Sequence, residues 1–378
     1  MNELDQIELT AMLKSIAKDH GFHSLKISRA TTVDSDADVA VDRIIKGNFS
    51  GLTWFTEERM QVASNPTVLL PSARSVMTFA INYFDSDAEP RRNLQRGQIA
   101  RYALGQDYHR SLKRRLSQYM DAVKAIIEFS PEYRIFVDDS PLLERAFARE
   151  SGLGWVGKNT NLLVPGNGSW VFLAEIIISL ELVPDEPSKK SCGSCRRCVD
   201  ICPTGAISSE YEVNNDICIS FLTIENRGPI PTELRKPMGT WIFGCDLCQE
   251  ICPVNARADE VAFDEFRIRE EMHEFDMREI LKMSEEAFRD KFQGTPIMRA
   301  KYTGMQRNVC VALGNIANPE DVDLLIETLG NISPLVRGHA VWALAQIGSE
   351  AALKALNAHS IDEQDAWVIV ELVDALGN

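Results

Sequence analysis

The stretch CGSCRRCVDICP, residues 192–203, decides how the middle of this chain folds, and a shorter version of it, CDLCQEICP, returns at residues 245–253. A further thiol, Cys218, lies between the two stretches. The first stretch has the spacing of bacterial ferredoxins, in which three thiolates bind one 4Fe-4S cluster and the fourth binds the other. The sequence therefore predicts a ferredoxin-like module that carries electrons through two clusters.

The ferredoxin rule divides eight of the thiols into two sets of four. The first predicted set is Cys192, Cys195, Cys198 and Cys252. The second is Cys202, Cys218, Cys245 and Cys248, in which Cys218 replaces the thiol that a symmetric ferredoxin has three residues before Cys245.

Zinc and disulfides are the alternative interpretations of these thiols. Zinc sites use Cys-x-x-Cys pairs but rarely add a third cysteine and a Cys-Pro at this spacing. Disulfides need an oxidising compartment, and the acidic start of the chain has no apolar stretch typical of a signal peptide. The ninth cysteine, Cys310, follows apolar residues at helical spacing and is expected to be a buried small residue.

Composition places the chain among globular proteins of two or three domains. It has 378 residues, of which 45% are hydrophobic and 25% charged. The most apolar stretch, residues 170–183, contains Glu175 and Glu181 and is shorter than the ~20 residues that cross a bilayer. We therefore expect no membrane span and a cytoplasmic protein. The net charge of −15 argues against indiscriminate binding to nucleic acid but allows a local basic surface.

Residues 1–185 alternate between helical and strand patterns, which favours an α/β domain. Helices are predicted over residues 4–18 and 107–129, and strands over residues 75–84, 133–137 and 171–180.

Three further segments follow this domain. The cluster module is predicted over residues 186–258, and an acidic helical connector over residues 259–295. In residues 296–378, the pattern at 309–316 returns 31 residues later at 340–347, which is typical of a HEAT-like repeat of helix pairs. We expect these repeats to form a short all-α binding appendage.

Residues 137–159 contain the highest concentration of candidate functional residues in the first domain. This segment places Asp138 and Asp139 after a predicted strand, where loops often carry catalytic groups. The alternative is that one of these acids, or Ser140, only caps the helix expected from Pro141. The glycine-rich part lacks the context of a phosphate-binding loop. His109 lacks the following glycine of the Asp-x-His-x-x-Gly loops that supply a histidine ligand to some corrinoids.

Basic residues concentrate in two regions of this acidic chain. One precedes the repeats and includes Arg299, Lys301 and Arg307; the other spans residues 91–115. Either could bind phosphates, and each could equally be a solvated helix face.

Taken together, these residues resemble the epoxyqueuosine reductase family, the cobalamin-dependent iron–sulfur enzymes of tRNA queuosine biosynthesis. The similarity covers nearly the whole chain. It includes residues 70–76, 101–109, 137–159 and 218–223, both cysteine stretches and the repeats. The corrinoid reductive dehalogenases are related to this family but lack the C-terminal repeats.

The resemblance implies an enzyme that reduces epoxyqueuosine to queuosine at the wobble position of tRNA, with loss of water. It implies a base-off cobalamin between the α/β domain and the cluster module. Asp138 would be the proton donor, and Asp139, where the family usually has Thr or Ser, leaves open whether both acids share that role. The implied cobalamin contacts are Arg59, Ala100, Asp138, Asn159, Leu162, Ile224 and Asp246, and Ala100 stands where some members have a cysteine.

The implied partners are the tRNA, bound in part by Arg299, Lys301 and Arg307, and an external low-potential electron donor. We expect a monomer. Two rival functions remain at this point: a corrinoid reductase that acts on a small molecule, and a non-enzymatic electron carrier whose repeats dock a redox partner.

Overall fold

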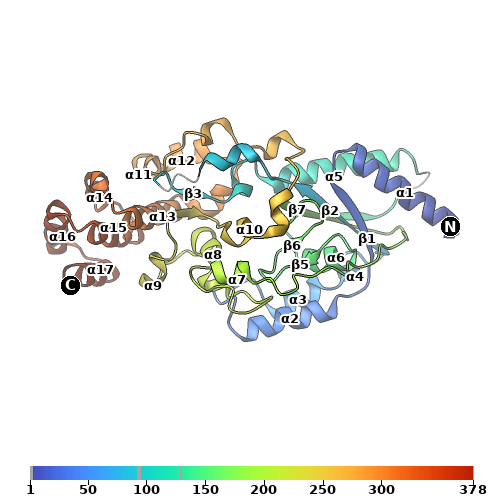
Figure 1. The fold of residues 1–378 in the computed structure, drawn as a ribbon, viewed down its shortest axis with the longest axis horizontal. Helices are drawn as coiled ribbons and strands as arrows, with labels where there is room; N and C mark the ends of the chain where they lie inside the picture. The colour runs from blue at the N-terminus through green and yellow to red at the C-terminus, as the bar shows by residue number, and fades with distance from the viewer. Residues whose placement is uncertain (1–2, 92–94, 128–129, 378) are drawn as a thin grey trace.

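The computed structural model describes residues 3–91, 95–127 and 130–377. The molecule is elongated, with the two termini at opposite ends (Figure 1). The sheet-containing domain forms one end, the helical repeats form the other, and the segment with the cysteines lies between them.

A four-stranded antiparallel sheet is the centre of the first domain, with the strand order β1-β2-β7-β4. The strands are β1 (Ser24–Arg29), β2 (Ser75–Asn82), β7 (Val171–Ile178) and β4 (Tyr133–Phe136). All eight residues of β2 are buried, because helices cover both faces of the sheet.

Two long helices, α1 (Glu3–Asp19) and α5 (Tyr108–Lys124), pack on one face of the sheet (Figure 1). The short helix α6 (Glu144–Glu150) covers the other face through Phe147. The predicted helices over 4–18 and 107–129 and the three predicted strands are thereby confirmed, with ends shifted by a few residues. Strand β1 was not predicted. The remaining elements of this domain are α2 (Asp34–Ile45), α3 (Glu57–Ala63), α4 (Pro66–Leu69), β5 (Trp155–Val156) and β6 (Leu162–Leu163).

The segment with the cysteines consists of short elements joined by turns. They are α7 (Arg197–Ile201), α8 (Ile219–Ile224), α9 (Thr232–Arg235), β8 (Trp241–Phe243) and α10 (Leu247–Glu250). Strand β8 pairs in parallel with β3 (Gln98–Ile99) of the first domain. This pairing fixes residues 98–103 against the cysteine segment.

The predicted helical connector is only partly helical. Its α-helices are α11 (Arg278–Lys282) and α12 (Glu285–Phe292), and residues 259–277 contain only short 3-10 turns. These residues lie across the first domain instead: Val261 donates a hydrogen bond to Phe84, and Phe263 and Phe266 join the core beneath α5. Tertiary contacts therefore replace the helix that the acidic composition suggested.

The last part of the chain is all helical. Its helices are α13 (Lys301–Ile316), α14 (Val322–Thr328), α15 (Pro334–Ile347), α16 (Glu350–Asp362) and α17 (Ala366–Leu376). Helices α13 and α15 end 31 residues apart, which confirms the predicted repeat. Glycine allows the close packing of successive units: a Cβ on Gly314 would lie 2.5 Å from Trp342, and one on Gly338 would lie 2.2 Å from Trp367.

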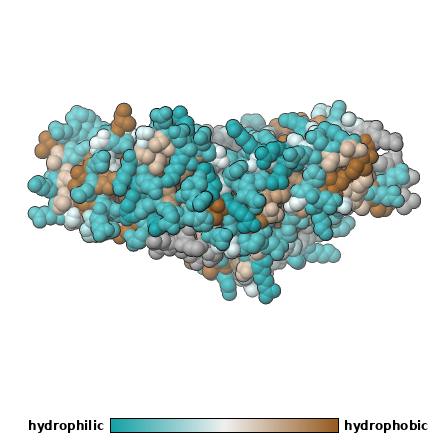
Figure 2. All heavy atoms as spheres, turned by 90° about the horizontal axis from the view of Figure 1, so that it is seen from above, coloured by the Kyte–Doolittle hydropathy of each residue, from teal (hydrophilic) through white to brown (hydrophobic). Residues whose placement is uncertain are grey.

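One continuous apolar core joins the repeats to the cysteine segment. It runs from α8 and β8 through α11 and α12 to α13, α15 and α17. The repeats are therefore built onto the cysteine segment and are not a separate appendage. The surface is mainly polar, with apolar residues gathered near both ends of the molecule (Figure 2). Among the described residues, no helix combines the length and the apolar character needed to cross a membrane.

Candidate active site and cluster cysteines

The seven cysteines of the two stretches lie around two neighbouring short helices, and the eighth, Cys218, directly precedes α8. Helix α7 joins Cys195 and Cys198 to Cys202, helix α10 joins Cys245 to Cys252, and the two helices pack against each other. All eight residues are partly buried and carry free thiols, whereas Cys310 is fully buried in α13. The expectation for Cys310 is thus confirmed.

The electrostatic contacts among the thiols follow the predicted sets. Burial raises the pKa of Cys252, and the neighbouring Cys192 and Cys195 raise it further. The pKa of Cys198 is raised by burial and then by Cys192 and Cys252. These influences link all four members of the first set electrostatically, although among the described residues no group of three or more side chains is arranged as a metal site.

The thiols of the second set also influence one another electrostatically. Burial raises the pKa of Cys245, with further contributions from Cys248 and Cys218. The pKa of Cys218 is raised by burial and by Cys202. Burial raises the pKa of Cys248 to about 12, and this thiol is influenced by Cys218 and, more weakly, by Cys198 of the first set. The two sets are therefore adjacent.

Asp138 lies in the loop that follows β4. Its backbone is left-handed, with φ 49°, and its amide donates a hydrogen bond of 2.6 Å to Glu144 Oε1. Tyr108 donates its hydroxyl to Asp138 Oδ2, and Tyr108 in turn stacks on Phe172 at 4.3 Å. The side chain of Asp138 is 59% exposed, so a substrate can reach it.

The neighbouring Asp139 has a different environment. It forms an ion pair with Lys113 and accepts a hydrogen bond from Ser140. Burial alone would raise the pKa of Asp139, but the hydrogen bond from Lys113 lowers it overall. Asp139 is consequently held as a carboxylate, which makes it a poor proton donor.

Three parts of the chain meet around the partly buried side chain of Tyr102. Burial raises the pKa of this phenol, followed by the charges of Asp138 from the first domain and Asp246 from the cysteine segment. Arg299, just before the repeats, and Glu225, at the end of α8, are its other charged neighbours. We call Tyr102, Asp138, Asp246, Arg299 and Glu225 the Tyr102 ring of residues.

Asp246 is the buried acid of this ring. It is 2% exposed, and Oδ2 accepts a 2.7 Å hydrogen bond from the amide of Arg101. Burial raises its pKa to about 7. Ala100 lies close by: its amide donates to Phe243, and a Cβ on Gly244 would come within 2.5 Å of the Ala100 methyl.

The remaining residues that the sequence suggests as cobalamin contacts have different environments. Asn159 is buried and donates to the carbonyl of Cys248 at 3.3 Å. Ile224 and Leu162 are buried apolar residues. Arg59, on α3, stacks over Trp54 at 4.9 Å, and in the described part of the chain no hydrogen bond or ion pair joins its side chain to the Tyr102 ring.

The basic residues before the repeats do not share one surface. Arg299 forms an ion pair with Glu225 and is half exposed. Lys301, at the start of α13, is exposed. Arg307 is 0% exposed and donates to the carbonyls of Leu222, Asn226 and Gly228.

The expectation that Arg307 contacts nucleic acid is therefore wrong for this structure. Its guanidinium is enclosed and its donors are already used. Burial lowers its pKa to about 9. Arg307 instead holds the chain that follows α8.

Much of the second basic region, residues 91–115, is also engaged within the protein. Arg101 is buried and Arg115 forms an ion pair with Glu265. Residues 92–94, including Arg92, lie outside the described part of the chain.

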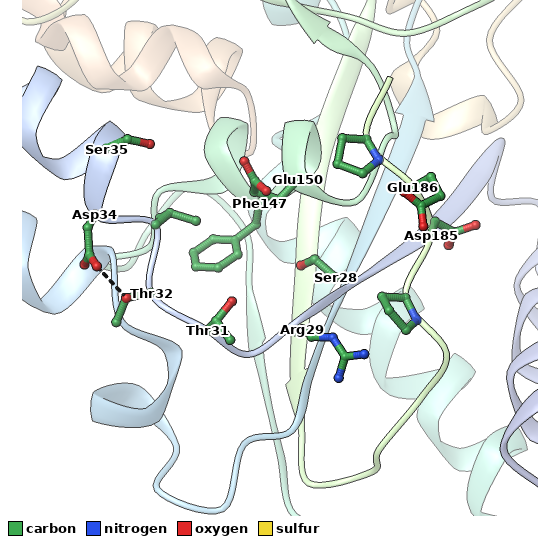
Figure 3. A pocket seen from close by; sticks show the side chains of 13 residues that line it. Ser28, Arg29, Thr31, Thr32, Asp34, Ser35, Phe147, Glu150, Asp185 and Glu186 are labelled. Carbon is green, nitrogen blue, oxygen red and sulfur yellow. Dashed lines mark hydrogen bonds between the residues drawn. The ribbon is translucent and has the colours of Figure 1, made fainter. Parts of the chain in front are cut away.

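Four residues of the site were not found from sequence: Tyr102, Tyr108, Glu144 and Glu175. Only Glu175 carried a signal, as the one acid inside the apolar strand 171–178. A separate cavity lies at the far end of α6, lined by residues 28–35, Phe147, Glu150 and residues 184–187 (Figure 3). It contains none of the Tyr102 ring and is not part of the candidate active site.

The fold and these contacts define a two-cluster iron–sulfur redox protein, with an acid loop, a cysteine module and helical repeats meeting around one site. Three family models match: "4Fe-4S double cluster binding domain" over residues 191–255, "Epoxyqueuosine reductase QueG, DUF1730" over residues 64–139, and "HEAT repeats" over residues 296–377. The first model favours iron–sulfur clusters over zinc and disulfides.

Curated relatives match over most of the chain. The epoxyqueuosine reductase of Xanthomonas campestris is 37% identical over 91% of this chain and 98% of its own. That of Escherichia coli is 35% identical over 91% of this chain and 90% of its own. The chain belongs to the epoxyqueuosine reductase family, and the resemblance seen in the sequence is confirmed.

Solved structures agree over 98% of both chains. A selenomethionine-labelled epoxyqueuosine reductase matches with a TM-score of 0.91 at 31% identity. An epoxyqueuosine reductase with an epoxyqueuosine-modified tRNA-Tyr stem loop matches with a TM-score of 0.90 at 31% identity. An epoxyqueuosine reductase from Bacillus subtilis, in which a catalytic loop named for an aspartate is swung out of the active site, matches with a TM-score of 0.89 at 31% identity.

Proposed function

We propose that this protein reduces epoxyqueuosine to queuosine at the wobble position of tRNA, using two 4Fe-4S clusters and a base-off cobalamin. The observation that carries the proposal is the Tyr102 ring, in which Asp138, Asp246 and Arg299 from three parts of the chain act electrostatically on one partly buried phenol. An acid, a redox module and a cation thus meet in a chain that belongs to the epoxyqueuosine reductase family.

The two thiol sets would hold the clusters. Cys192, Cys195, Cys198 and Cys252 would bind the first cluster, and Cys202, Cys218, Cys245 and Cys248 the second. Burial keeps several of these thiols protonated when free, so cluster binding must expel protons. An external low-potential donor would supply the electrons.

The residues implied for cobalamin fit such a group in chemical type. Asn159 and Asp246 are polar side chains that can hydrogen-bond to the amides around a corrin, and Ala100 and Ile224 offer small or apolar surface. His109 is held by Asp107, with Nδ1 2.8 Å from Oδ1, so turning toward a metal would break that hydrogen bond. When bound, cobalamin would supply a strongly reducing centre that could accept electrons one at a time and deliver two electrons to the substrate.

Arg59 fits this set less well, because its guanidinium is stacked on Trp54. Its contact with cobalamin would require the loop before α3 to approach the Tyr102 ring. Arg59 is therefore one of the two proposed contacts that fit cobalamin least well. The other is Leu162 of β6, whose side chain is buried in the core.

Asp138 would donate the proton to the oxygen that leaves as water. Its carboxyl is exposed, Tyr108 orients it, and the competing Asp139 is committed to Lys113. A general acid in this position contributes ~10²–10⁴-fold to the rate.

Arg299 and Lys301 would contact the tRNA close to the site. Arg299 is half exposed, and Asp138 and Tyr108 are among its charged neighbours. A structural relative is solved with a modified tRNA stem loop, which supports a tRNA substrate. We further propose that the protein acts as a monomer in the cytoplasm.

The test is an anaerobic reconstitution followed by an assay on tRNA from cells unable to reduce epoxyqueuosine. Cobalamin binding is read from the visible spectrum, and turnover from queuosine in the tRNA. Asp138→Asn should keep the cobalamin spectrum and lose turnover, whereas the matched variant Asp139→Asn should keep both. Binding of cobalamin without any tRNA reduction would favour a small-molecule reductase, and no cobalamin binding would favour an electron carrier.

A further inference from the structure

Glu175 lies in the middle of the sheet, where a carboxylate is costly. It is 0% exposed on β7, with Thr78 of β2 and Phe136 of β4 as its register partners. Within the described residues, neither Glu175 oxygen accepts a hydrogen bond, and the hydroxyl of Thr78 also lacks a partner. An isolated buried carboxylate of this kind is neutralised by a proton or paired with another group.

The neighbouring acid is Glu144, the first residue of α6. Its Oε1 accepts the 2.6 Å hydrogen bond from the Asp138 amide. Asp138 has a left-handed backbone, a strained conformation for a residue other than glycine, which persists only where the surrounding structure holds it. The Glu144 carboxyl is the group that holds this amide.

The two glutamates influence each other strongly. Burial and, after it, the charge of Asp138 raise the pKa of Glu144 to about 8. Burial raises the pKa of Glu175 well above its usual range, and the charge of Glu144 raises it further. Two carboxylates cannot hydrogen-bond to each other, but they can once one of them carries a proton.

In the described part of the chain no cation forms an ion pair with either glutamate, although the charge of Arg145 lowers the pKa of Glu144. The charged and titratable groups packed around it are Asp138 and Asp139 in the loop, Arg145 on α6, Lys26 on β1, Arg134 on β4, and Tyr108 and Lys113 on α5. Lys26 binds Asp185, Arg134 binds the carbonyl of Leu69, and Arg145 binds the carbonyl of Thr160. Strands β5 and β6, which also pack on α6, contain no titratable residue.

We propose that a proton joins Glu144 and Glu175 at neutral pH, and that this protonated pair is a latch that holds the Asp138 loop in its catalytic conformation. Glu144 is thus a positioning residue that acts on the substrate only through Asp138. The inference rests on the proposed function, because it takes Asp138 as the proton donor.

The latch has a defined pH dependence. Below the Glu144 pKa of about 8 the shared proton joins the two side chains, and Glu144 still offers an oxygen to the Asp138 amide. As the pH rises above this value the pair loses protons, and negative charge accumulates beside Asp138. The loop that carries Asp138 should therefore become less ordered as the pH rises. This change should occur whether or not a substrate is bound.

Amide hydrogen exchange of residues 137–143 in the full-length reconstituted protein tests the latch, at pH values on both sides of 8. Glu144→Ala should expose the Asp138 amide at every pH. Glu144→Gln and Glu175→Gln each replace the shared proton by a permanent N–H donor, so both should keep the amide protected above the pH at which the native protein loses protection. Glu150→Gln, at the other end of α6, is the matched control and should follow the native protein.

Turnover gives the second readout. Glu144→Ala should lower kcat by up to about a hundredfold with little change in KM, since a displaced catalytic group costs about this much. Glu144→Gln should restore kcat and extend activity to higher pH. The latch is overturned if Glu144→Ala leaves the amide protected, or if both Gln variants lose protection at the same pH as the native protein. An absence of tRNA reduction in the native protein would instead overturn the proposed function, while the exchange result would still decide on the latch.

Discussion

Arg235 and Glu371 form a bidentate ion pair that is almost completely buried. Nη1 of Arg235 lies 2.6 Å from Oε2 of Glu371, and Nη2 lies 2.6 Å from Oε1. Their side chains are 1% and 9% exposed. Because Arg235 is on α9 of the cysteine segment and Glu371 is on α17, this pair fixes the last helix of the chain to the electron-transfer module.

Breaking this pair from one side should destabilise the protein strongly. Glu371→Ala leaves the Arg235 guanidinium buried without its counter-charge, which costs about 3–5 kcal/mol. The double variant Arg235→Met, Glu371→Leu should be much closer to the native protein, since it removes both charges. Urea unfolding, followed by fluorescence, measures the difference. As a control, Glu285→Ala breaks an exposed pair with Arg289 and should change stability by less than about 1 kcal/mol.

Single cysteine substitutions should separate the two clusters. Cys252→Ser and Cys192→Ser should give the same residual paramagnetic resonance spectrum, because both remove a ligand of the first set. Cys218→Ser and Cys202→Ser should share the other spectrum, each with about half of the native iron. Cys310→Ser should keep all the iron, because this thiol is buried in α13. If Cys252→Ser instead gave the spectrum of Cys218→Ser, the assignments of Cys252 and Cys202 would have to be exchanged.

The sequence was sufficient for the elements with strong periodicity. The strand at residues 75–82 is mostly apolar and is buried on both faces, and the repeat of 31 residues needs only local similarity. Strand β1 was missed because its six residues, SLKISR, alternate too briefly to be told from a loop. The connector was misjudged because its conformation depends on contacts with the first domain, such as that of Val261 with Phe84.

The site shows the same division between local and tertiary information. The cysteine sets are predicted from spacing, whereas the role of Asp138 is predicted only through the family resemblance, because its place after a strand equally suits a helix cap. The burial of Arg307 could not be predicted, because α13 is enclosed on nearly all sides by the cysteine segment and α15. The latch pair could not be predicted either, since Glu144 and Glu175 are 31 residues apart and meet only when α6 packs on the sheet.

Arg299 and Arg307 should differ sharply when they are replaced. Arg299→Gln together with Lys301→Gln should weaken tRNA binding and reduce the slope of log affinity against log salt by about 0.7–0.9 for each phosphate that is no longer neutralised. Arg307→Met leaves the carbonyls of Leu222, Asn226 and Gly228 without their donor and should cost more than about 2 kcal/mol of stability. Filter binding at several salt concentrations and urea unfolding distinguish the two effects. A normal salt slope in the double variant would direct attention to residues 91–115.

Tyr108→Phe should impair catalysis without affecting cofactor binding. The variant removes one hydrogen bond to Asp138 Oδ2 but keeps the ring that stacks on Phe172. Hydrogen bonds to charged groups contribute about 1.5–3 kcal/mol, so kcat should fall about tenfold to a hundredfold while the cobalamin spectrum and iron content stay native. Tyr133→Phe, whose hydroxyl is bonded to Lys124 at the opposite end of β4, is the matched control and should turn over normally. A native kcat in Tyr108→Phe would mean that Asp138 is oriented by its backbone and Glu144 alone, and that the phenol only fills the space between α5 and the sheet.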